Sequence, residues 1–465
     1  MSKVETWLRE EKNIIVACLH PDTFGPLMRT CNQSLLQNHV GRMGDEFLFH
    51  LESRDQLELH RMFNHLSSIP NALNEFYHQF SKHVMRVELF ATSSLVNGTA
   101  DSSTAKAYIK ELLEIHAYYD TLIKTAFASD AKFLRCFDEW FVQFVNKNGV
   151  CQQKPDKSAM LLAAHADSLL RESIHTQEIE LADKLAGVMT IFQYLMDKET
   201  FHIAYSKRMA DRLLKGRSLS VQAEKLMIGG LHEAGGFEHT RKLETMLEDT
   251  KISSALNVGF QCWLRESGWL RVGAGVSFQV LRAWSWPLAI DPSSSGTSFI
   301  PPKSIVNAHS RFDKFYKSKH VGRELRWMWH LCNGELKANF DSSPRVPYVF
   351  RVSAYQMSIL LLFNSHATIS YDSIQQNTGL GEEHLQQYLS VFLYAGLLNI
   401  SPDTSHPVSG TQFALNLNFS SPKIKVNLLR NGGAERERKN IEEIRAEQER
   451  QHCLEVWLSN TSGAW

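Results

Sequence analysis

The amino-acid sequence predicts a mainly α-helical protein with a C-terminal α+β part. Apolar residues recur at helical spacing up to about residue 266. Beyond residue 268, alternation of apolar and polar residues becomes common, which is typical of half-buried strands. The length of 465 residues exceeds the roughly 250–300 residues that one hydrophobic core supports, so more than one domain is expected.

The helical part divides into three stretches with polar breaks between them. These stretches are residues 1–90, 105–148 and 158–266, and the polar run 92–104 is the first expected linker. Because short connections join amphipathic helices in the third stretch, we expect antiparallel packing in a helical bundle.

The most detailed helical signals lie within residues 201–256. Four apolar residues at four-residue spacing define one helix face: Phe201, Tyr205, Met209 and Leu213. Lys215 and Gly216 form an expected helix end, because glycine turns left-handed at low cost and cations suit the C-terminal dipole. Ser220 is an expected N-cap for the next helix, which the glycine pair 235–236 ends.

The C-terminal part is expected to interleave strands and helices. Alternation over 276–284 predicts a half-buried strand, and the Pro-, Ser- and Gly-rich run 287–302 predicts a loop. The elements expected after it are a helix at 306–318, strand-like pieces at 324–330, 335–340 and 348–352, a three-helix unit at 354–400, and a hairpin of 413–419 and 423–428. A charged, helix-prone run begins at residue 432.

The composition restricts the class of partner and the compartment. Lysine plus arginine and aspartate plus glutamate both number 50, which disfavours DNA and membranes as main partners. The seven cysteines include no CxxC pair and indicate reduced thiols rather than a disulfide framework. The charged N-terminus is not a secretory signal, and no apolar run reaches the roughly 20 residues that span a bilayer. We therefore expect a soluble protein of the cytoplasm and nucleus.

No motif predicts a catalytic, metal or cofactor site. His232 and Glu233 resemble the start of a zinc-protease helix, but Gly236 stands where the second ligand is needed. Gly273 and Gly275 lack the third glycine of a dinucleotide loop, and neither GxxxxGK[ST] nor GxSxG occurs. The sequence therefore predicts a protein without catalytic residues, metal or cofactor, and hence not an enzyme.

The three-helix unit at 354–400 outlines a helix-turn-helix and, with flanking strands, a winged helix. A DNA reader needs Lys or Arg on the third helix to neutralise phosphates, whereas this one presents Glu382, Glu383, Gln386 and Gln387. A structural or protein-docking role is favoured, and nucleic-acid binding is the alternative.

A basic group at the end of the first helix in 201–256 allows two interpretations. Its members are Lys207, Arg208, Arg212, Lys215 and Arg217. They form either the solvated side of an amphipathic helix or a docking site for an acidic partner, which electrostatic steering would favour.

Four long islands of sequence are specific enough to indicate a family. They are YSKRMADRLLKGRSLS with EKLMIGGLHEAGGFEHTRKLETMLEDTKIS, VSFQVLRAWSWPL, RFDKFYKSKHVGRELRWMWHLCNGELKANF, and VSAYQMSILLLFN. Together with weaker matches over residues 1–430, they resemble the cullins, the scaffolds of cullin-RING ubiquitin ligases. The runs WPLAI, YQMSILLLFN and FALNLNFSS are most similar to the elongin-linked, cullin-2-like branch.

The resemblance implies a domain organisation and a small antiparallel or mixed sheet with an inserted winged helix. The implied regions are helical cullin repeats at 1–100 and 101–155, a four-helix bundle at 156–270, an α/β sheet region at 271–353, a winged-helix subdomain at 354–400, closing strands at 401–430, and a charged, divergent tail at 431–465.

The resemblance also implies partners. In the family a RING-box zinc protein adds a strand to the sheet by β-augmentation, and that protein holds the ubiquitin-conjugating enzyme. The residues assigned to the RING contact by this resemblance are Val276, Phe278, Val280, Leu281, Trp284 and Trp286. The scaffold then works by proximity in ubiquitin-dependent protein degradation, and the basic group would attract an acidic tail of the conjugating enzyme.

Three departures from the family pattern modify this expectation. The adaptor-binding first repeat has no counterpart before Met1, and the winged helix with the modified lysine has none after Leu428. We therefore expect a chain truncated at both ends, without an elongin-type adaptor site or a neddylation lysine. Asp211 interrupts a usually basic motif. Besides a RING-binding scaffold, the alternatives are a nonproductive fragment that sequesters RING protein and a winged-helix nucleic-acid binder.

Overall fold

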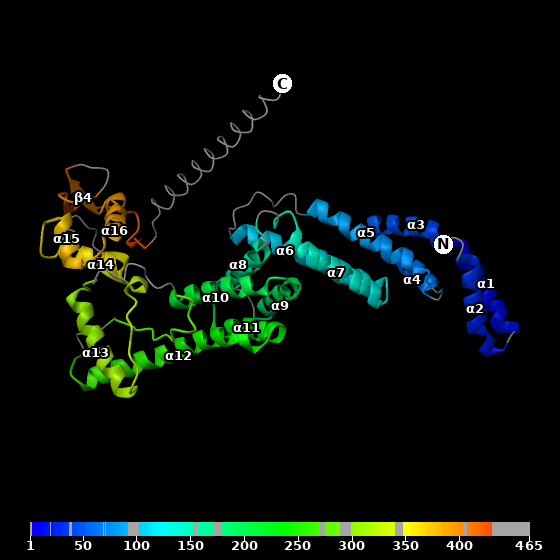
Figure 1. Cartoon of the computed structure of the whole chain (residues 1–465), viewed down its shortest axis with the longest axis horizontal. Coiled ribbons are helices and arrows are strands. Elements are labelled where there is room, and N and C mark those ends of the chain that lie inside the picture. Colours follow the sequence, from blue (N-terminus) through cyan, green and yellow to red (C-terminus); the bar gives the residue numbers. More distant parts are fainter. Residues whose placement is uncertain are drawn as a thin grey trace, which may run out of the picture. The chain divides into compact units, whose positions relative to one another are not determined.

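The computed structural model describes most of the chain (Figure 1). The described residues are 2–18, 20–36, 40–67, 69, 71–91, 102–151, 154, 156–171, 178–269, 275–288, 299–339, 347–402 and 407–429. The tail expected at 431–465 and most of the linker expected at 92–104 lie outside them. The chain forms two compact units, one of Met1–Ala255 with Gln279–Leu288, the other of Leu256–Phe278 with Ala289–Trp465.

The first unit is built from helices, as the spacing predicts. The helices described in it are α1 (Ser2–Cys18), α2 (Pro21–Leu36), α3 (Val40–Ser53), α4 (Gln56–Leu66), α5 (Leu73–Ala91), α6 (Ser102–Thr125), α7 (Ala131–Lys147), α8 (Lys157–Arg171), α9 (Glu178–Tyr194), α10 (Lys198–Leu214), α11 (Val221–Gly235) and the first part of α12 (Phe237–Glu266). The stretch 105–148 contains two helices, because the Asp130 side chain caps α7 by accepting from the backbone N–H groups of Lys132 and Phe133 at 2.9 and 3.2 Å.

Phenylalanine rings fill the core between α3, α5 and α7. The Phe127 and Phe133 rings stack with centroids 4.1 Å apart, and the Phe47 and Phe76 rings form a T-shaped pair with centroids 4.4 Å apart. All four side chains are shielded from solvent. Aromatic pairs of this kind stabilise a core beyond their buried area, by about 0.5–1.5 kcal/mol each.

Helices α8 to α11 pack as α8 against α10 and α9, and α9 against α11 (Figure 1). The helix ends predicted here are confirmed. Lys215 is the C-cap of α10, and Gly216 follows with φ 60°. The Ser220 hydroxyl accepts from the Ala223 N–H at 3.0 Å and begins α11, which Gly236 ends with φ 83°.

The second unit combines α13 (Lys303–Lys319) with two small sheets. One sheet has the order β1 (Asn333–Ala338), β2 (Tyr348–Ser353), β6 (Lys425–Asn427), with β1 antiparallel and β6 parallel to β2. The other has the order β3 (Thr368–Ser370), β5 (Gln412–Leu415), β4 (Leu398–Ser401), and is antiparallel. The predicted fold class, mainly α with a C-terminal α+β part and a small mixed sheet, is confirmed.

The predicted three-helix unit is also present, as α14 (Ala354–Leu362), α15 (Tyr371–Thr378) and α16 (Glu382–Tyr394), gathered beside β4 in Figure 1. Gly379, with φ 65°, is the C-cap of α15. The Ser353 and Gln356 side chains form a capping box at the start of α14. The Gln356 Nε2 also donates to the Leu428 carbonyl at 2.9 Å, and so ties α14 to the end of β6.

Three strand predictions are wrong. Residues 276–282 pair with no strand among the described residues, and residues 283–285 form a turn. Residues 324–328 are irregular and lead into the 3-10 turn Trp329–Leu331. The hairpin of 413–419 and 423–428 does not form, because β5 and β6 belong to different sheets. Alternation of apolar and polar residues indicates that one face of a segment is buried. It does not indicate which groups form hydrogen bonds with the backbone at the segment's edges.

Candidate protein-docking surfaces

Arg212 of the basic group is buried rather than exposed. Its side chain is fully shielded and lies between Asp167 on α8 and Glu224 on α11. Nε and Nη2 donate to the two Glu224 oxygens at 2.7 and 2.8 Å, and Nη1 donates to Asp167. The Ser218 hydroxyl donates to Glu224 Oε1 at 2.6 Å. The charge of Arg212 is neutralised inside the chain, so this side chain cannot contribute to a docking surface. The prediction that Arg212 belongs to the docking group is therefore wrong.

The burial of Arg212 follows from helix geometry. Seven residues make almost two turns, so Arg212 lies on the same face as Tyr205, one of the apolar positions of α10. Its guanidinium carbon lies 5.8 Å from the Tyr205 ring centroid. Burial would lower the pKa of Arg212, but the hydrogen bonds that it donates to Glu224 and the neighbouring negative charges outweigh this effect and raise that pKa. Burial, followed by the Glu224 charge, raises the pKa of Tyr205.

The other members of the group remain at the surface of α10 and the loop after it. Lys207, Lys215 and Arg217 are exposed and Arg208 is half-buried. We call these four residues the basic face. Backbone hydrogen bonds attach the loop that carries Arg217 to α10 and to α8. The Arg217 N–H donates to the Arg212 carbonyl and the Leu219 N–H donates to the Leu170 carbonyl, each at 2.9 Å.

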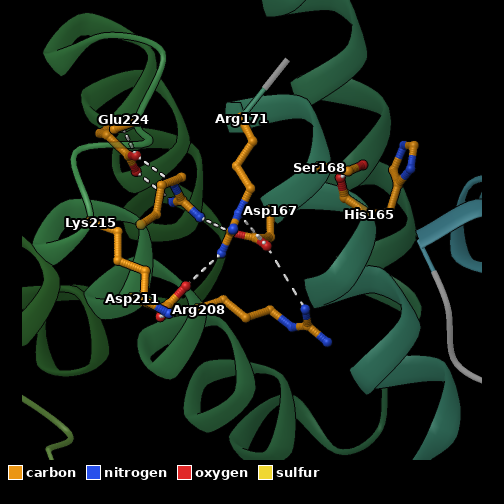
Figure 2. A network of polar contacts seen from close by, with 10 residues as sticks. His165, Asp167, Ser168, Arg171, Arg208, Asp211, Lys215 and Glu224 are labelled. Atoms are coloured by element: carbon orange, nitrogen blue, oxygen red, sulfur yellow. Dashed lines mark hydrogen bonds and ion pairs between the residues drawn. The ribbon is translucent and has the colours of Figure 1, made fainter. Parts of the chain in front are cut away.

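Two carboxylates lie among the cations of the basic face (Figure 2). Asp167 forms ion pairs with Arg171 Nε at 2.9 Å and with Arg208 Nη1 at 3.8 Å. Asp211 binds the Lys215 ammonium with one oxygen and Arg171 Nη2 at 3.1 Å with the other. Burial would raise the pKa of Asp211, but its bonds to Lys215 and Arg171 outweigh that effect and lower the pKa. Asp211 is therefore charged at neutral pH and already paired.

The residues 276–286, which we call the extended segment, include all six positions expected to contact a RING protein. In the first unit the segment lies along α12. The Val280 N–H donates to the Ser253 hydroxyl at 2.8 Å, and that hydroxyl donates to the Val280 carbonyl at 3.1 Å. One helical turn earlier, Asp249 accepts from the Arg282 N–H at 2.8 Å and from Arg282 Nε at 2.6 Å.

The two tryptophans of the extended segment differ in environment. Trp286 is buried and its indole N–H donates to Asp249 at 2.9 Å, so it anchors the segment. Trp284 is 53% exposed, with the Arg241 guanidinium 5.7 Å from its ring centroid. Leu281 is half-buried and packs on the core of the first unit. Trp284 is therefore the large apolar side chain of this segment that a partner can reach.

In the second unit, Phe278 is bound in the same manner. Its N–H donates to Asn257 Oδ1 at 2.8 Å, and the Asn257 amide donates to the Phe278 carbonyl at 2.7 Å. The Phe278 ring stacks on Phe312 of α13 at 4.1 Å and meets Phe260 of α12 edge-on at 5.7 Å. Val276 is half-buried.

The two edges of the extended segment are thus unequal. In the first unit, side chains of α12 satisfy the backbone N–H groups of Val280 and Arg282. In an extended chain the intervening peptide groups point the opposite way. Within the described part of the first unit, the N–H groups of Gln279 and Leu281 have no hydrogen-bond partner. That edge can accept a strand.

The third helix of the winged-helix unit carries no lysine or arginine. Glu382 and Glu383 are exposed at its start, and Gln386 donates to Glu382 at 3.2 Å. Among the residues with described positions, no three His, Cys, Asp or Glu side chains gather as metal ligands. The helices described include none that is long and apolar enough to cross a bilayer.

The helical first unit and the sheet-containing second unit define a protein of the helical-solenoid class with an α+β domain. The model of the cullin alpha solenoid domain matches residues 1–257, and the model of the cullin alpha+beta domain matches residues 280–419. This chain belongs to the cullin family.

Similar proteins share this organisation. The chain is 34% identical over 433 residues to Cullin-1 of Schizosaccharomyces pombe, covering 92% of this chain and 55% of the relative. It is 35% identical over 432 residues to Cullin-1 of Dictyostelium discoideum, with the same coverage. Cullin-2 of Caenorhabditis elegans is 26% identical over 443 residues, covering 92% of this chain and 54% of the relative. These identities give no support to the expected cullin-2-like branch, and the chain spans about half the length of the curated relatives it matches.

Proposed function

We propose that this chain is a scaffold subunit of a cullin-RING ubiquitin ligase of the cytoplasm and nucleus. It binds a RING-box zinc protein and through it positions a ubiquitin-conjugating enzyme for ubiquitin-dependent protein degradation. The observation that supports the proposal is the first-unit part of the extended segment. One of its edges is bonded to α12, while the N–H groups of Gln279 and Leu281 on the other edge lack partners in the described chain.

Strand addition suits this edge for a physical reason. Backbone groups of a partner strand would satisfy the outward N–H groups, and main-chain bonds supply affinity in this mode of recognition. Side chains next to the edge would supply specificity, and the exposed Trp284 is a suitable anchor because aromatic residues dominate binding energy at interfaces. The chain itself performs no chemistry in this proposal and raises the effective concentration of the reacting groups.

The basic face gives the second contact. Lys207, Arg208, Lys215 and Arg217 would attract an acidic segment of the conjugating enzyme and raise its association rate, an effect that salt screens. Arg212 plays no direct part, since its charge is neutralised inside the chain.

The test is co-purification with a RING-box protein, comparing wild type with Gln279→Pro and Gln279→Ala. Proline removes an outward N–H that has no partner in the described chain, and it favours extended backbone at the preceding residue. Gln279→Ala keeps the N–H. We expect at least a tenfold loss of RING binding for the proline variant, and wild-type binding for the alanine variant.

Two outcomes would reject parts of the proposal. Wild-type chain that fails to bind any RING-box protein rejects the scaffold function. Equal binding by both Gln279 variants, with unchanged circular dichroism, rejects this edge as the binding site. A complex that binds but does not accelerate ubiquitin discharge from a charged conjugating enzyme favours the sequestering alternative.

A further inference from the structure

Asp211 places a carboxylate where the basic face would bind an acidic partner. One of its oxygens pairs with Lys215 and the other lies 3.1 Å from Arg171 Nη2, and Figure 2 shows the three side chains converging. The Asp211 side chain is 36% exposed and that of Lys215 is 46% exposed, so solvent and a partner can reach both.

The charges around this point are only partly balanced within the chain. Six cations (Arg171, Lys207, Arg208, Arg212, Lys215 and Arg217) surround three carboxylates (Asp167, Asp211 and Glu224), which leaves a net charge of +3. Asp167 and Glu224 are buried and cannot move without disrupting the helix packing. Asp211 alone among the three is partly exposed, and rotation of its side chain would release two cations.

The remaining cations differ in availability. No carboxylate of the described residues lies within 4 Å of the charged groups of Lys207 or Arg217. Arg208 has a loose contact with Asp167 at 3.8 Å. These three residues can bind an anion directly, whereas Lys215 and Arg171 can do so only in exchange for Asp211.

We propose that Asp211 is an internal competitor that makes the basic face selective for segments with several closely spaced carboxylates. This inference rests on the function proposed for the basic face. A single carboxylate that displaces Asp211 exchanges one ion pair for another and gains little. A polyacidic segment first engages Lys207, Arg208 and Arg217, so its next carboxylate competes with Asp211 at high effective concentration.

The test uses two fluorescein-labelled peptides on the whole chain, one of ten glutamates and one with a single glutamate among glycine and serine. Binding is measured by fluorescence anisotropy at several salt concentrations. Asp211→Asn keeps the side-chain shape and removes the competing charge. We expect the ten-glutamate peptide to bind about two- to fivefold more tightly, the range for a partly exposed ion pair, with a steeper salt dependence. The single-glutamate peptide should gain measurable binding in this variant.

Glu180→Gln on α9 is the matched control. Glu180 forms an i,i+4 pair with Lys184 at 2.9 Å, so this substitution changes net charge equally at a site remote in sequence from the basic face. The affinity of Glu180→Gln for either peptide should stay within a factor of 1.5 of the wild-type affinity, because exposed ion pairs contribute little free energy. Asp211→Ser serves as a second variant, and circular dichroism checks the fold of each.

The outcomes separate this inference from the function on which it depends. Asp211→Asn binding no more tightly than Glu180→Gln overturns the competitor role. The double variant Lys207→Glu with Arg217→Glu should abolish binding of the ten-glutamate peptide. If it does while Asp211→Asn has no effect, the basic face stands and the competitor role fails. If the double variant binds like wild type, both the role of the basic face in binding acidic segments and the competitor role of Asp211 are rejected.

Discussion

Arg212 and Glu224 form a bidentate ion pair in which neither side chain is exposed to solvent. Arg212 donates from Nε and Nη2 to the two carboxylate oxygens of Glu224, at 2.7 and 2.8 Å. Planar pairing of this kind fixes geometry as well as charge, and here it joins α10 to α11. Asp167 adds a bond from α8, so three helices share one buried guanidinium.

Replacing Arg212 with methionine should lower the free energy of unfolding by about 3–5 kcal/mol, because two buried carboxylates lose their cation. Urea denaturation followed by circular dichroism measures the change. Arg217→Met is the matched control at an exposed site and should stay within about 0.5 kcal/mol of wild type. Similar midpoints for the two variants would contradict the role of the buried pair.

Asp249→Ala should release the first-unit half of the extended segment. Asp249 is buried and accepts from the Arg282 N–H, from Arg282 Nε and from Trp286 Nε1, so its removal leaves three donors unpaired. We expect faster hydrogen exchange at residues 280–286 and a red shift of tryptophan emission. The control is Glu248→Ala, since Glu248 is 59% exposed and forms an ion pair with the same Arg282 side chain. Unchanged exchange in Asp249→Ala would show that the segment is held by other contacts.

Phe133→Ala should destabilise the first unit by about 3–5 kcal/mol, because the ring is shielded and stacks on Phe127 at 4.1 Å. Its neighbour Leu134 is 42% exposed, so Leu134→Ala should have a much smaller effect. Urea denaturation distinguishes the two. A loss below about 1 kcal/mol for Phe133→Ala would mean that the core collapses into the cavity without strain.

The region around His116 should lose stability as the pH falls. Burial lowers the pKa of His116, with the charges of Asp120 and Asp138 partly opposing the shift. A histidine whose folded pKa lies below its unfolded value of about 6.5 stabilises the fold above that value, and this contribution disappears as the pH falls through the folded pKa. The protection factors of α6 and α7, which correct for the intrinsic pH dependence of amide exchange, should therefore fall between pH 7.5 and 5.

His116→Gln provides the comparison for this pH dependence. Glutamine cannot titrate, and its amide can take the place of the Nε2 that lies 3.2 Å from the Tyr194 hydroxyl. The difference in protection between wild type and variant, taken at equal pH, should shrink between pH 7.5 and 5. A constant difference would show that His116 does not titrate in this range.

Local signals in the sequence predicted local structure well. Ser220, Gly216 and Gly236 were placed correctly because a cap or a left-handed turn depends on a few neighbouring residues. The three-helix unit at 354–400 was found for the same reason. The segment 276–284 was misread because its edge groups bond to side chains of α12, a contact that residues nearby in sequence do not encode.

The burial of Arg212 could have been predicted from spacing. Glu224 stands with Met227, Ile228 and Leu231 at the separations that make one helix face. Asp167 stands with Ala163, Ala166 and Leu170 in the same way. Charged residues within two apolar stripes need a buried cation, and Arg212, seven residues after Tyr205, is the candidate on α10. Lys215 stands at the i,i+4 helical spacing from Asp211, so that pair is predictable, whereas the pair with Arg171 on α8 depends on tertiary packing and only the structure reveals it.

The hydrogen bonds that join Ser253 and Asp249 to the extended segment reduce the entropy lost when a partner strand binds it. Fixing the backbone of one residue costs about 1–2 kcal/mol of conformational entropy, and for Val280 and Arg282 this loss already occurs in folding. An incoming strand would lose its own freedom while meeting a template that is already ordered. Substitutions of Ser253 or Asp249 would then weaken partner binding without removing any direct contact with the partner. They would increase the conformational freedom of the segment, which the partner would have to restrict on binding.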